Sequence, residues 1–513
     1  MYKLIRDIEK IYAHEPQKPY EQSFTPLSIS LCSNLDTIRT RFGDSADLTV
    51  RDIRLSGINA AVISIDNMTD KQVLAEAVLS PLFAFRFSSD PETCFNEIKY
   101  RAVHTADIIE TDSVEKIENA IMSGCAVILI NGCAKGISAG IQGYASRGVS
   151  QPDSDVVQRG SKEGFVEALR VNMTLIRRRL KNPSLKFEVM TIGETGRTEI
   201  ALCYLTDTVS PEILQKLRNR LKKVNLKTVL ASGYLLPFLE EKNDFSFFSG
   251  AGVTERPDTV CGKLTEGRIA IMTDGVPSAL IVPYLFTEYF QTLDDYSNRA
   301  YFATFTRILK YIAFFISVLL PGFFTALGTF DPEMFPAILL NKIASSIAAT
   351  PLSLTAETVI VLFVYEIMRE AGLRMPQPLG YAVSIVGGLV VGDTAVNAGL
   401  IGAPTLMVVA LTAISAYVVP DLYAPSCILR FIFTLAGGIF GIWGIAAVFG
   451  IVLINLCAKT SFGIPYLSPV SPFGAYFFRD VIIRAGWKIL AKKNKTVQDL
   501  PGADIKGGQS ENE

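Results

Sequence analysis

The stretch FIFTLAGGIFGIWGIAAVFGIVLINLCA, residues 431–458, contains no charged side chain. A transmembrane helix needs about 20 predominantly apolar residues, so this stretch alone is long enough to cross a bilayer. The apolar character begins at Ile308, and Asp393 is the sole charged residue between positions 375 and 420. The block 308–458 therefore predicts several membrane spans, preceded by a long region of ordinary soluble composition.

The apolar block divides into five expected spans, at about residues 308–328, 352–368, 380–401, 403–420 and 431–457. The segment Met334–Thr350 is shorter and more polar, so it lies in the membrane interface, re-enters the membrane or forms a sixth span. Basic residues before the first span and after the second favour a cytoplasmic location for both of these ends. The basic tail favours the same side, whereas five spans would place it opposite. The sequence alone leaves this conflict open.

The composition excludes several classes of protein. The formal net charge of the 513 residues is −1, which gives no indication of nucleic-acid binding. The eight cysteines form no Cys-x-x-Cys pair, and with two histidines they predict reduced cytoplasmic thiols and no zinc site. The first residues, MYKLIRDIEKIYAHEP, contain no apolar core of a signal peptide, so we expect the first membrane helix to direct insertion.

The region before the membrane block alternates short strands and helices, which predicts a soluble α/β region in two subdomains. In the first subdomain, Ala60–Ile65 and Ala126–Ile130 are apolar runs typical of strands. Asp70–Leu79 and Ser113–Met122 are expected to be helices. Residues 1–40 predict a helix followed by an extended arm.

The second subdomain follows a polar, proline-containing linker. Apolar residues recur at helical spacing from Phe165 to Leu180 and predict a helix. Further strands are expected at 186–191 and 199–205, and further helices at 211–222 and 235–240. The dipeptide Asp274-Gly275 supplies the positive φ angles of a tight turn, so Arg268–Met272 and Val276–Val282 are expected to form a hairpin.

These patterns divide the chain into five parts. They are an N-terminal α/β subdomain (1–147), a linker (148–162), a second α/β subdomain (163–300), a transmembrane helical domain (301–458) and a basic tail (459–513) whose end is expected to be disordered.

Three carboxylates, Glu357, Glu366 and Asp393, fall within the expected spans, where an ionised group is costly and usually marks an ion path or a helix contact. Glu366 precedes Arg369 by three residues, so a local ion pair at the membrane edge explains it. Glu357 has no such neighbour and lies on the opposite helical face, and Asp393 lies in a glycine-rich run. We take Glu357 and Asp393 as candidate residues of an ion path, against the alternative that they serve helix packing.

Proline and glycine residues mark candidate positions for gating or packing. Pro321 lies inside the first span, where it removes a backbone hydrogen bond and kinks the helix. Gly437 and Gly441 form a GxxxG motif, which lets helices approach closely. Packing within one chain and contact between copies remain equal alternatives for this motif.

The sequence contains no recognisable catalytic motif. Neither histidine lies near a nucleophile in a known pattern, and the stretch GCAKGISAGIQGYASRG lacks the spacing of a phosphate-binding loop. We therefore expect no enzyme activity, no cofactor and no metal.

An ordered set of motifs resembles the GerA family of spore germination proteins. The matches run from about residue 150 to 473 and include LIRRRLKNP (175–183), SGYL (232–235), TERPDTV (254–260), EGRIAIMTDGVPSALIVP (266–283), REAGLRMPQPLGYAVSIVGGLVVGD (369–393), ALTAISAYVVP (410–420) and SFGIPYLSPVSP (461–472). In the linker, Asp155 stands where the family more often has Glu, and Ser161-Lys162 replace the usual Pro-Arg.

The resemblance implies a membrane subunit of a spore germination receptor, located in the spore inner membrane with its soluble region on the cytoplasmic side. It also implies a homo-oligomer in membrane lipid, such as a pentamer, that forms an ion channel and releases monovalent cations early in germination. The implied partners are receptor subunits of the B and C types or other spore membrane proteins, and no nucleic acid. It leaves open whether the chain is a receptor A subunit or the related stage V sporulation protein AF. The alternative is an accessory membrane scaffold or a secondary transporter, although residues 308–457 show no internal repeat.

Overall fold

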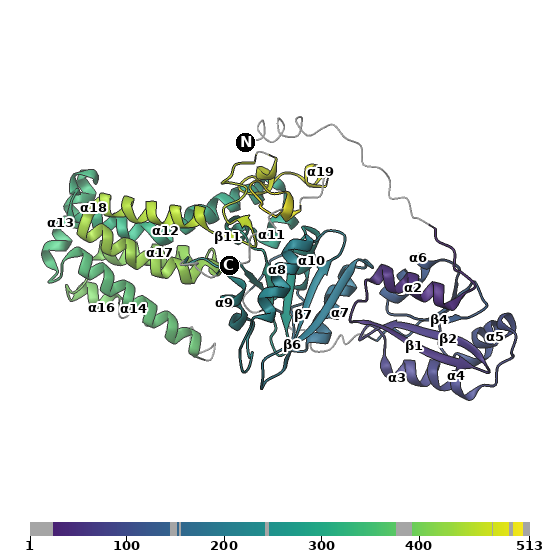
Figure 1. Ribbon diagram of the computed structural model, residues 1–513. Helices are drawn as coiled ribbons and strands as arrows, with labels where there is room; N and C mark the ends of the chain where they lie inside the picture. The colour runs from purple at the N-terminus through teal and green to yellow at the C-terminus, as the bar shows by residue number, and fades with distance from the viewer. Residues whose placement is uncertain are drawn as a thin grey trace.

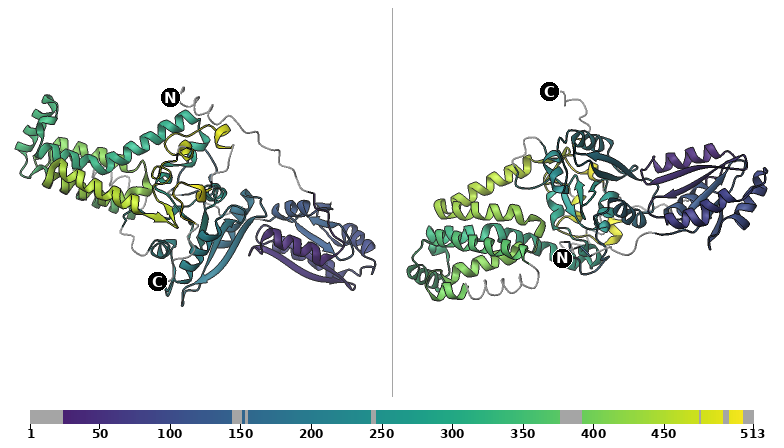
Figure 2. Two further views of the ribbon diagram at one scale, coloured as in Figure 1. Left: turned by 45° about the horizontal axis from the view of Figure 1, so that its top comes forward. Right: turned by 90° about the horizontal axis from the view of Figure 1, so that it is seen from below.

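The computed structural model describes residues 24–143, 151–152, 155–241, 246–375, 392–474, 476–491 and 496–505. Two α/β subdomains and a helical domain follow one another along the molecule (Figure 1). The second subdomain lies between the other two parts in every view (Figure 2). The first subdomain is therefore at the end of the molecule furthest from the helical domain.

The first subdomain is a five-stranded antiparallel sheet of order β1-β2-β4-β5-β3 with helices on both faces. Its strands are β1 (Leu48–Leu55), β2 (Ile58–Ile65), β3 (Ile108–Thr111), β4 (Ala126–Ile130) and β5 (Gly136–Ala139). Its helices are α2 (Leu31–Phe42), α3 (Lys71–Val73), α4 (Ser80–Ala84), α5 (Pro91–Glu97) and α6 (Val114–Met122), with π-helical turns at Leu74–Leu79 and Ile98–Ala102. The central strands read as continuous apolar runs because helices bury both faces of the sheet.

The second subdomain has the same architecture, with the sheet order β6-β7-β9-β10-β8. Its strands are β6 (Leu185–Ile192), β7 (Thr198–Leu205), β8 (Gly252–Thr254), β9 (Ile269–Thr273) and β10 (Ala279–Val282). Its helices are α7 (Leu169–Arg179), α8 (Pro211–Lys222), α9 (Leu236–Leu239) and α10 (Pro257–Thr265). Helices α7 and α10 cover one face, and α8 and α9 cover the other together with residues from the C-terminal tail.

The two subdomains repeat one topology down to individual side chains, a duplication that the sequence analysis missed. Asn34, the fourth residue of α2, accepts the Ser28 N–H at 2.8 Å and donates to the Ser28 carbonyl at 2.7 Å. Asn172, the fourth residue of α7, forms the same pair of hydrogen bonds with Val166, at 2.8 and 2.6 Å. Both amides are buried, so each fixes the chain entering its helix by satisfying backbone groups.

A buried arginine joins the two subdomains. Arg177 in α7 has no exposed surface, and its guanidinium donates two hydrogen bonds of 2.9 Å to the Asp47 carboxylate of the first subdomain. Arg177 also donates a hydrogen bond to the Ser45 hydroxyl, which accepts another from the Phe187 N–H. Bidentate pairing of this kind fixes orientation as well as distance, so the subdomains meet in one geometry here.

The hairpin expected around Asp274-Gly275 is confirmed, with a longer loop than a tight turn. Strands β9 and β10 are antiparallel, and Met272 pairs with Ala279. Gly275 has φ of 82°, as its position in the motif predicts. The loop spans 274–278 because Pro277 has no N–H to donate to the strand ladder.

The helical domain contains α11 (Leu293–Ser297), α12 (Ala300–Thr329), α13 (Ala337–Ala349), α14 (Leu354–Arg374), α16 (Gly392–Asn397), α17 (Ala403–Ala416) and α18 (Tyr423–Ala458). Among the described residues, the helices 300–329 and 420–458 are long and apolar enough to cross a membrane. The expected span at 380–401 lies mostly outside the described residues. Met334–Thr350, which the sequence left open, contains the short helix α13.

The expected span at 431–457 is not one continuous helix, because Gly441 breaks α18. Gly441 has φ of 62° and ψ of −149°, which is not helical. A Cβ on Gly444 would collide with the carbonyl oxygen of Ala436, whereas eight residues of continuous helix would separate the two by about 12 Å. The chain therefore reverses at Gly441, and Tyr423–Phe440 and Ile442–Ala458 are two antiparallel segments.

The helical domain begins and ends on the same side, at its end next to the second subdomain, which we call the near end. After α18, the short strands β11 (Thr460–Ser461) and β12 (Ile464–Pro465) lead into a tail that packs on the second subdomain. Phe462, Ile464, Val497 and Leu500 of this tail are buried in the core of that subdomain. The tail and the soluble region therefore lie on the same side of the helical domain, as the basic residues of the tail favour.

Candidate functional site

Glu357 lies in the first turn of α14, and its side chain is 1% exposed. This turn is at the end of the helical domain away from the second subdomain, which we call the far end (Figure 1). The Glu357 Oε1 accepts the N–H of Gly402, the N-cap of α17, at 2.8 Å. A Cβ on Gly402 would collide with the Ser346 hydroxyl of α13, so glycine allows three helices to meet at this carboxylate. The positive end of α17 favours a negative charge here. No arginine or lysine side chain that the structure describes forms an ion pair with Glu357.

Asp393, the second candidate for the ion path, lies in the first turn of α16 and is exposed. Within the described parts of the chain, its carboxylate has no hydrogen-bond or ion-pair partner. The structure thus places Glu357 inside the helical domain and Asp393 on its surface.

Pro321 lies inside α12, where it leaves the carbonyl of Ser317 without its helical donor. Arg430 of α18 supplies the missing donor, because its Nε lies 3.0 Å from the Ser317 oxygen. Arg430 has no exposed surface, so this hydrogen bond is shielded from water. Ser317 is seven residues beyond Lys310, about 10 Å along the helix from the basic near end. Pro321 therefore creates a binding position for a charged side chain of another helix.

Glu366 is the acidic partner of this arginine. The expected ion pair with Arg369 is present, with Nε 3.0 Å from the carboxylate. Arg430 approaches the same carboxylate at 3.3 Å, and the Tyr423 hydroxyl donates to it at 2.8 Å. Two cations therefore neutralise the Glu366 carboxylate, whereas the Glu357 carboxylate accepts only a backbone N–H among the described residues.

The glycines of α18 serve two purposes. A Cβ on Gly437 would collide with the carbonyl oxygen of Gly322, so this face of α18 packs closely on α12 one residue after Pro321. Gly441 lies against the ring of Phe330 and supplies the positive φ angle of the reversal. Within one chain, the GxxxG motif thus combines a helix contact at Gly437 with a break at Gly441.

A second buried charge cluster lies where α12 enters the helical domain. Arg307 has no exposed surface and forms ion pairs with Asp295 at 2.7 Å and with Asp480 of the tail at 2.8 Å. Lys310 lies 3.2 Å from Asp295, and the Tyr296 hydroxyl donates to Asp480 at 2.9 Å. The first membrane helix is therefore tied to the tail by charge-assisted hydrogen bonds.

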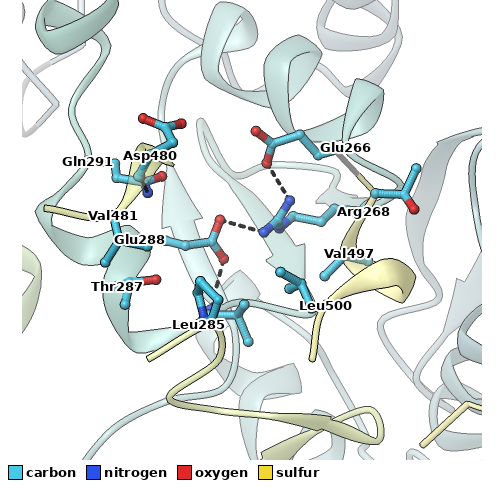
Figure 3. Close-up of a pocket in the computed structure, with 12 residues that line it drawn as sticks. Glu266, Arg268, Leu285, Thr287, Glu288, Gln291, Asp480, Val481, Val497 and Leu500 are labelled. Atoms are coloured by element: carbon cyan, nitrogen blue, oxygen red, sulfur yellow. Dashed lines mark hydrogen bonds and ion pairs between the residues drawn. The ribbon is translucent and has the colours of Figure 1, made fainter. Parts of the chain in front are cut away.

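A third cluster joins β9 to the segment before α11 (Figure 3). Arg268 is flanked by Glu266 and Glu288, and it lies 2.7 Å from the Glu288 carboxylate. Glu288 also accepts the Leu285 N–H at 2.9 Å and pairs with Lys263. The adjoining pocket is closed on one side by tail residues such as Val497 and is too small for an organic ligand. This cluster is structural.

A large cleft of about 720 Å³ lies at the junction of the second subdomain, the near end of the helical domain and the tail. Its wall includes linker residue Asp155, Tyr284 after β10, Lys310 of α12, Asp421 between α17 and α18, and Trp487 of α19 (Trp487–Leu490). Burial raises the pKa of Asp155 above its ordinary value, although the Thr254 hydroxyl donates to it at 2.6 Å and opposes this shift. The segment before α12, the connection between α17 and α18, and the tail all contribute to this cleft.

Sequence reasoning missed the charged residues that organise these clusters. Arg177, Arg307 and Arg430 are completely buried, whereas the sequence presents them as ordinary basic residues near helix ends or spans. For Arg430 a signal was available: a lone arginine follows Asp421 by nine residues and immediately precedes an uncharged span. An arginine in such a place usually has an acidic partner on a neighbouring helix.

Comparisons with known proteins agree on one family. The profile described as "Bacillus/Clostridium GerA spore germination protein" matches residues 36–496. Spore germination protein KA of Bacillus subtilis (strain 168) is 34% identical over 476 residues, which are 92% of this chain and 87% of that protein. Spore germination protein GerLA of Bacillus cereus is 32% identical and covers 90% of this chain and 94% of its own length. The uncharacterized membrane protein YfkQ of Bacillus subtilis (strain 168) is 33% identical, with 92% of each chain covered.

One solved structure is also similar. It is the crystal structure of the N-terminal domain of the A subunit of the Bacillus megaterium spore germinant receptor GerK3. It matches with 26% identity and a TM-score of 0.40, covering 52% of this chain and 99% of that one.

Proposed function

Because the chain belongs to the GerA family of spore germination proteins, the A subunits of germinant receptors, we propose that it forms the ion-conducting part of such a receptor. Several copies assemble around a common axis in the spore inner membrane and release monovalent cations early in germination. The two α/β subdomains lie on the cytoplasmic side and bind the other receptor subunits.

The observation that carries this proposal is the contrast between the two glutamates of α14. Glu366 is neutralised by Arg369 and Arg430 and holds helices together. Glu357 is buried at the far end and has no basic partner among the described side chains. A ring of such carboxylates, one from each copy, would concentrate cations at the mouth of a pore and repel anions.

The exposed surface of the second half of α18 supports assembly in lipid. Trp443, Ile451 and Ile454 are 84%, 68% and 71% exposed in the single chain. Apolar side chains of this size need lipid or another copy to cover them. This surface is distinct from the face around Gly437, which α12 already covers.

The test separates the charge of Glu357 from its hydrogen bond to α17. Purified full-length protein in liposomes loaded with KCl is compared with Glu357→Gln and Glu357→Ala. The glutamine keeps an oxygen for the Gly402 N–H and loses the charge, whereas alanine loses both.

We expect the wild-type oligomer to release K⁺, and Glu357→Gln to assemble normally but conduct K⁺ more slowly and with less discrimination against Cl⁻. Glu370→Gln, at an exposed position near the other end of α14, is the matched control and should conduct like the wild type. A wild-type oligomer that passes no ions would refute the channel. If Glu357→Gln conducts like the wild type and only Glu357→Ala loses stability, Glu357 is a helix cap and not part of the ion path.

A further inference from the structure

The cleft at the junction has the size and walls of a small-molecule site, and the proposed channel function makes no use of it. Its volume of about 720 Å³ is within the usual range for ligand pockets. Five aromatic side chains line it: Tyr284, Tyr289, Tyr296, Tyr417 and Trp487. Lys263 already lies over the Tyr284 ring, and Arg484 lies over the rings of Tyr296 and Trp487. The aromatic wall is therefore suited to cover the apolar part of a ligand.

Among the described residues, two carboxylates on the wall form no ion pair, although the Arg256 guanidinium lies near Asp155. Five acidic and three basic residues line the cleft: Asp155, Asp258, Glu266, Asp421 and Asp480, with Lys263, Lys310 and Arg479. Asp258 is paired with Arg256, Asp480 with Arg307, and Glu266 with Arg268. Lys263 and Lys310 are likewise paired with acidic residues.

Asp155 and Asp421 are the remaining pair. Asp155 accepts the Thr254 hydroxyl at 2.6 Å and forms no ion pair with a described residue. Asp421 has neither a hydrogen bond nor an ion pair within the described chain. Burial raises the pKa of Asp421 to about 6, and repulsion by the Asp155 carboxylate adds to this shift. A bound cation would relieve this repulsion.

Tyr284 provides an independent indication of a ligand. Its side chain is 9% exposed, its ring packs edge-on against Tyr289 with centroids 4.9 Å apart, and it lines the cleft. Its hydroxyl has no hydrogen-bond partner among the residues that the structure describes. This hydroxyl oxygen is not enclosed by the protein, so it can accept a hydrogen bond from a molecule in the cleft.

We propose that this cleft binds a small organic ammonium ion, with Asp155 and Asp421 facing its charge, Tyr284 accepting an N–H, and the aromatic rings covering its alkyl part. Alkyl chains favour the aromatic wall, and N–H donors satisfy both carboxylates and the hydroxyl. An inorganic cation would use the carboxylates alone. No group of three or more His, Cys, Asp or Glu suited to a metal occurs among the described residues.

The site lies where binding of a ligand can change how the soluble region contacts the membrane helices. Asp155 belongs to the linker, Tyr284 to the second subdomain and Asp421 to the connection between α17 and α18. A ligand that touches all three holds the soluble region against the membrane helices, so binding is expected to favour one arrangement of the two.

The experiment measures binding of 1,4-butanediammonium to the purified full-length protein by titration calorimetry at constant ionic strength. Butylammonium, the neutral analogue 1,4-butanediol and KCl are tested in parallel. We expect both ammonium ions to bind, the diol not to bind, and K⁺ at the same concentration not to compete. Asp421→Asn and Asp155→Asn should each weaken binding about tenfold or more, and Tyr284→Phe by a smaller factor, because hydrogen bonds to charged groups are the stronger ones.

Asp393→Asn removes an exposed carboxylate outside the cleft and should bind as the wild type does. A thermal unfolding scan without ligand shows whether each variant is folded. The proposal is overturned if neither ammonium ion binds, if both asparagine variants bind unchanged, or if K⁺ displaces the probe at equal concentration. None of these results depends on ion conduction, so the site and the channel are tested separately.

Discussion

The bond between Arg430 and the carbonyl exposed by Pro321 predicts a measurable coupling between two residues on different helices. In Arg430→Met, the Ser317 carbonyl has no donor in an apolar interior, which costs about 2 kcal/mol. Glu366 loses one of its two cations but keeps Arg369 and the Tyr423 hydroxyl, which adds about 1 kcal/mol. The single variant is therefore expected to lose about 3 kcal/mol.

Pro321→Ala restores an N–H that can bond to the Ser317 carbonyl within α12. In this background, Arg430→Met should cost only about 1 kcal/mol, so the coupling between the two sites is about 2 kcal/mol. The Arg430→Met substitution is therefore expected to lower the melting temperature by roughly 6–12 °C when made alone and by roughly 2–4 °C when made in the Pro321→Ala protein.

Thermal unfolding of the four proteins of this cycle in one detergent measures the coupling. Arg374→Met, at an exposed arginine of α14, is the control and should change stability by less than about 1 kcal/mol. If Arg430→Met costs the same with and without Pro321, the arginine does not replace the missing helical donor, and the reasoning about Pro321 is wrong.

Three further predictions concern single positions. Arg177→Met leaves the buried Asp47 carboxylate unpaired and should destabilise the soluble region by about 3–5 kcal/mol, whereas replacing both by apolar residues should cost much less; urea unfolding distinguishes these outcomes. Burial raises the pKa of the Glu115 carboxyl, but hydrogen bonds from Thr25 outweigh this effect and lower the pKa to about 2. The stabilising contribution of the Glu115 carboxylate is therefore complete above about pH 4.5 and is lost as the pH falls towards 2. Glu115→Gln should flatten the pH dependence of the melting temperature in that window, and an unchanged slope would contradict the assignment. Gly437→Ala should separate α12 from α18 and lower the melting temperature, while an unaffected variant would show that the close helix contact is absent in solution.

The elements of the soluble region follow from local patterns, and their assembly does not. Strand β4 and helix α6 were predictable because apolar runs and a glycine stop mark them in the sequence. The duplication was not, because it rests on hydrogen bonds such as those of Asn34 and Asn172 rather than on repeated sequence. Burial of Arg177 was also hidden, since its partner Asp47 is 130 residues away.

In the helical domain, composition identified membrane segments but not their turns. Residues 431–457 carry no charge, so nothing in the pattern separated the two antiparallel halves of α18 at Gly441. The sequence analysis described the tail only as basic with a disordered end, and it did not predict that Arg479 and Arg484 are buried, at 5% and 2% exposed. The ion pair of Glu366 with Arg369 was predictable because the two are neighbours on one helix, whereas Arg430 lies on another.

The reversal potential of the reconstituted oligomer is the most direct test of the proposed cation channel. Under a tenfold KCl gradient across a planar bilayer, an ideally cation-selective pore gives a reversal potential of about 59 mV in magnitude. We predict a value close to this limit for the wild type and a value clearly nearer zero for Glu357→Gln, with Glu370→Gln unchanged. A wild-type potential near zero, or one that is the same in Glu357→Gln, would contradict a cation path formed at this carboxylate.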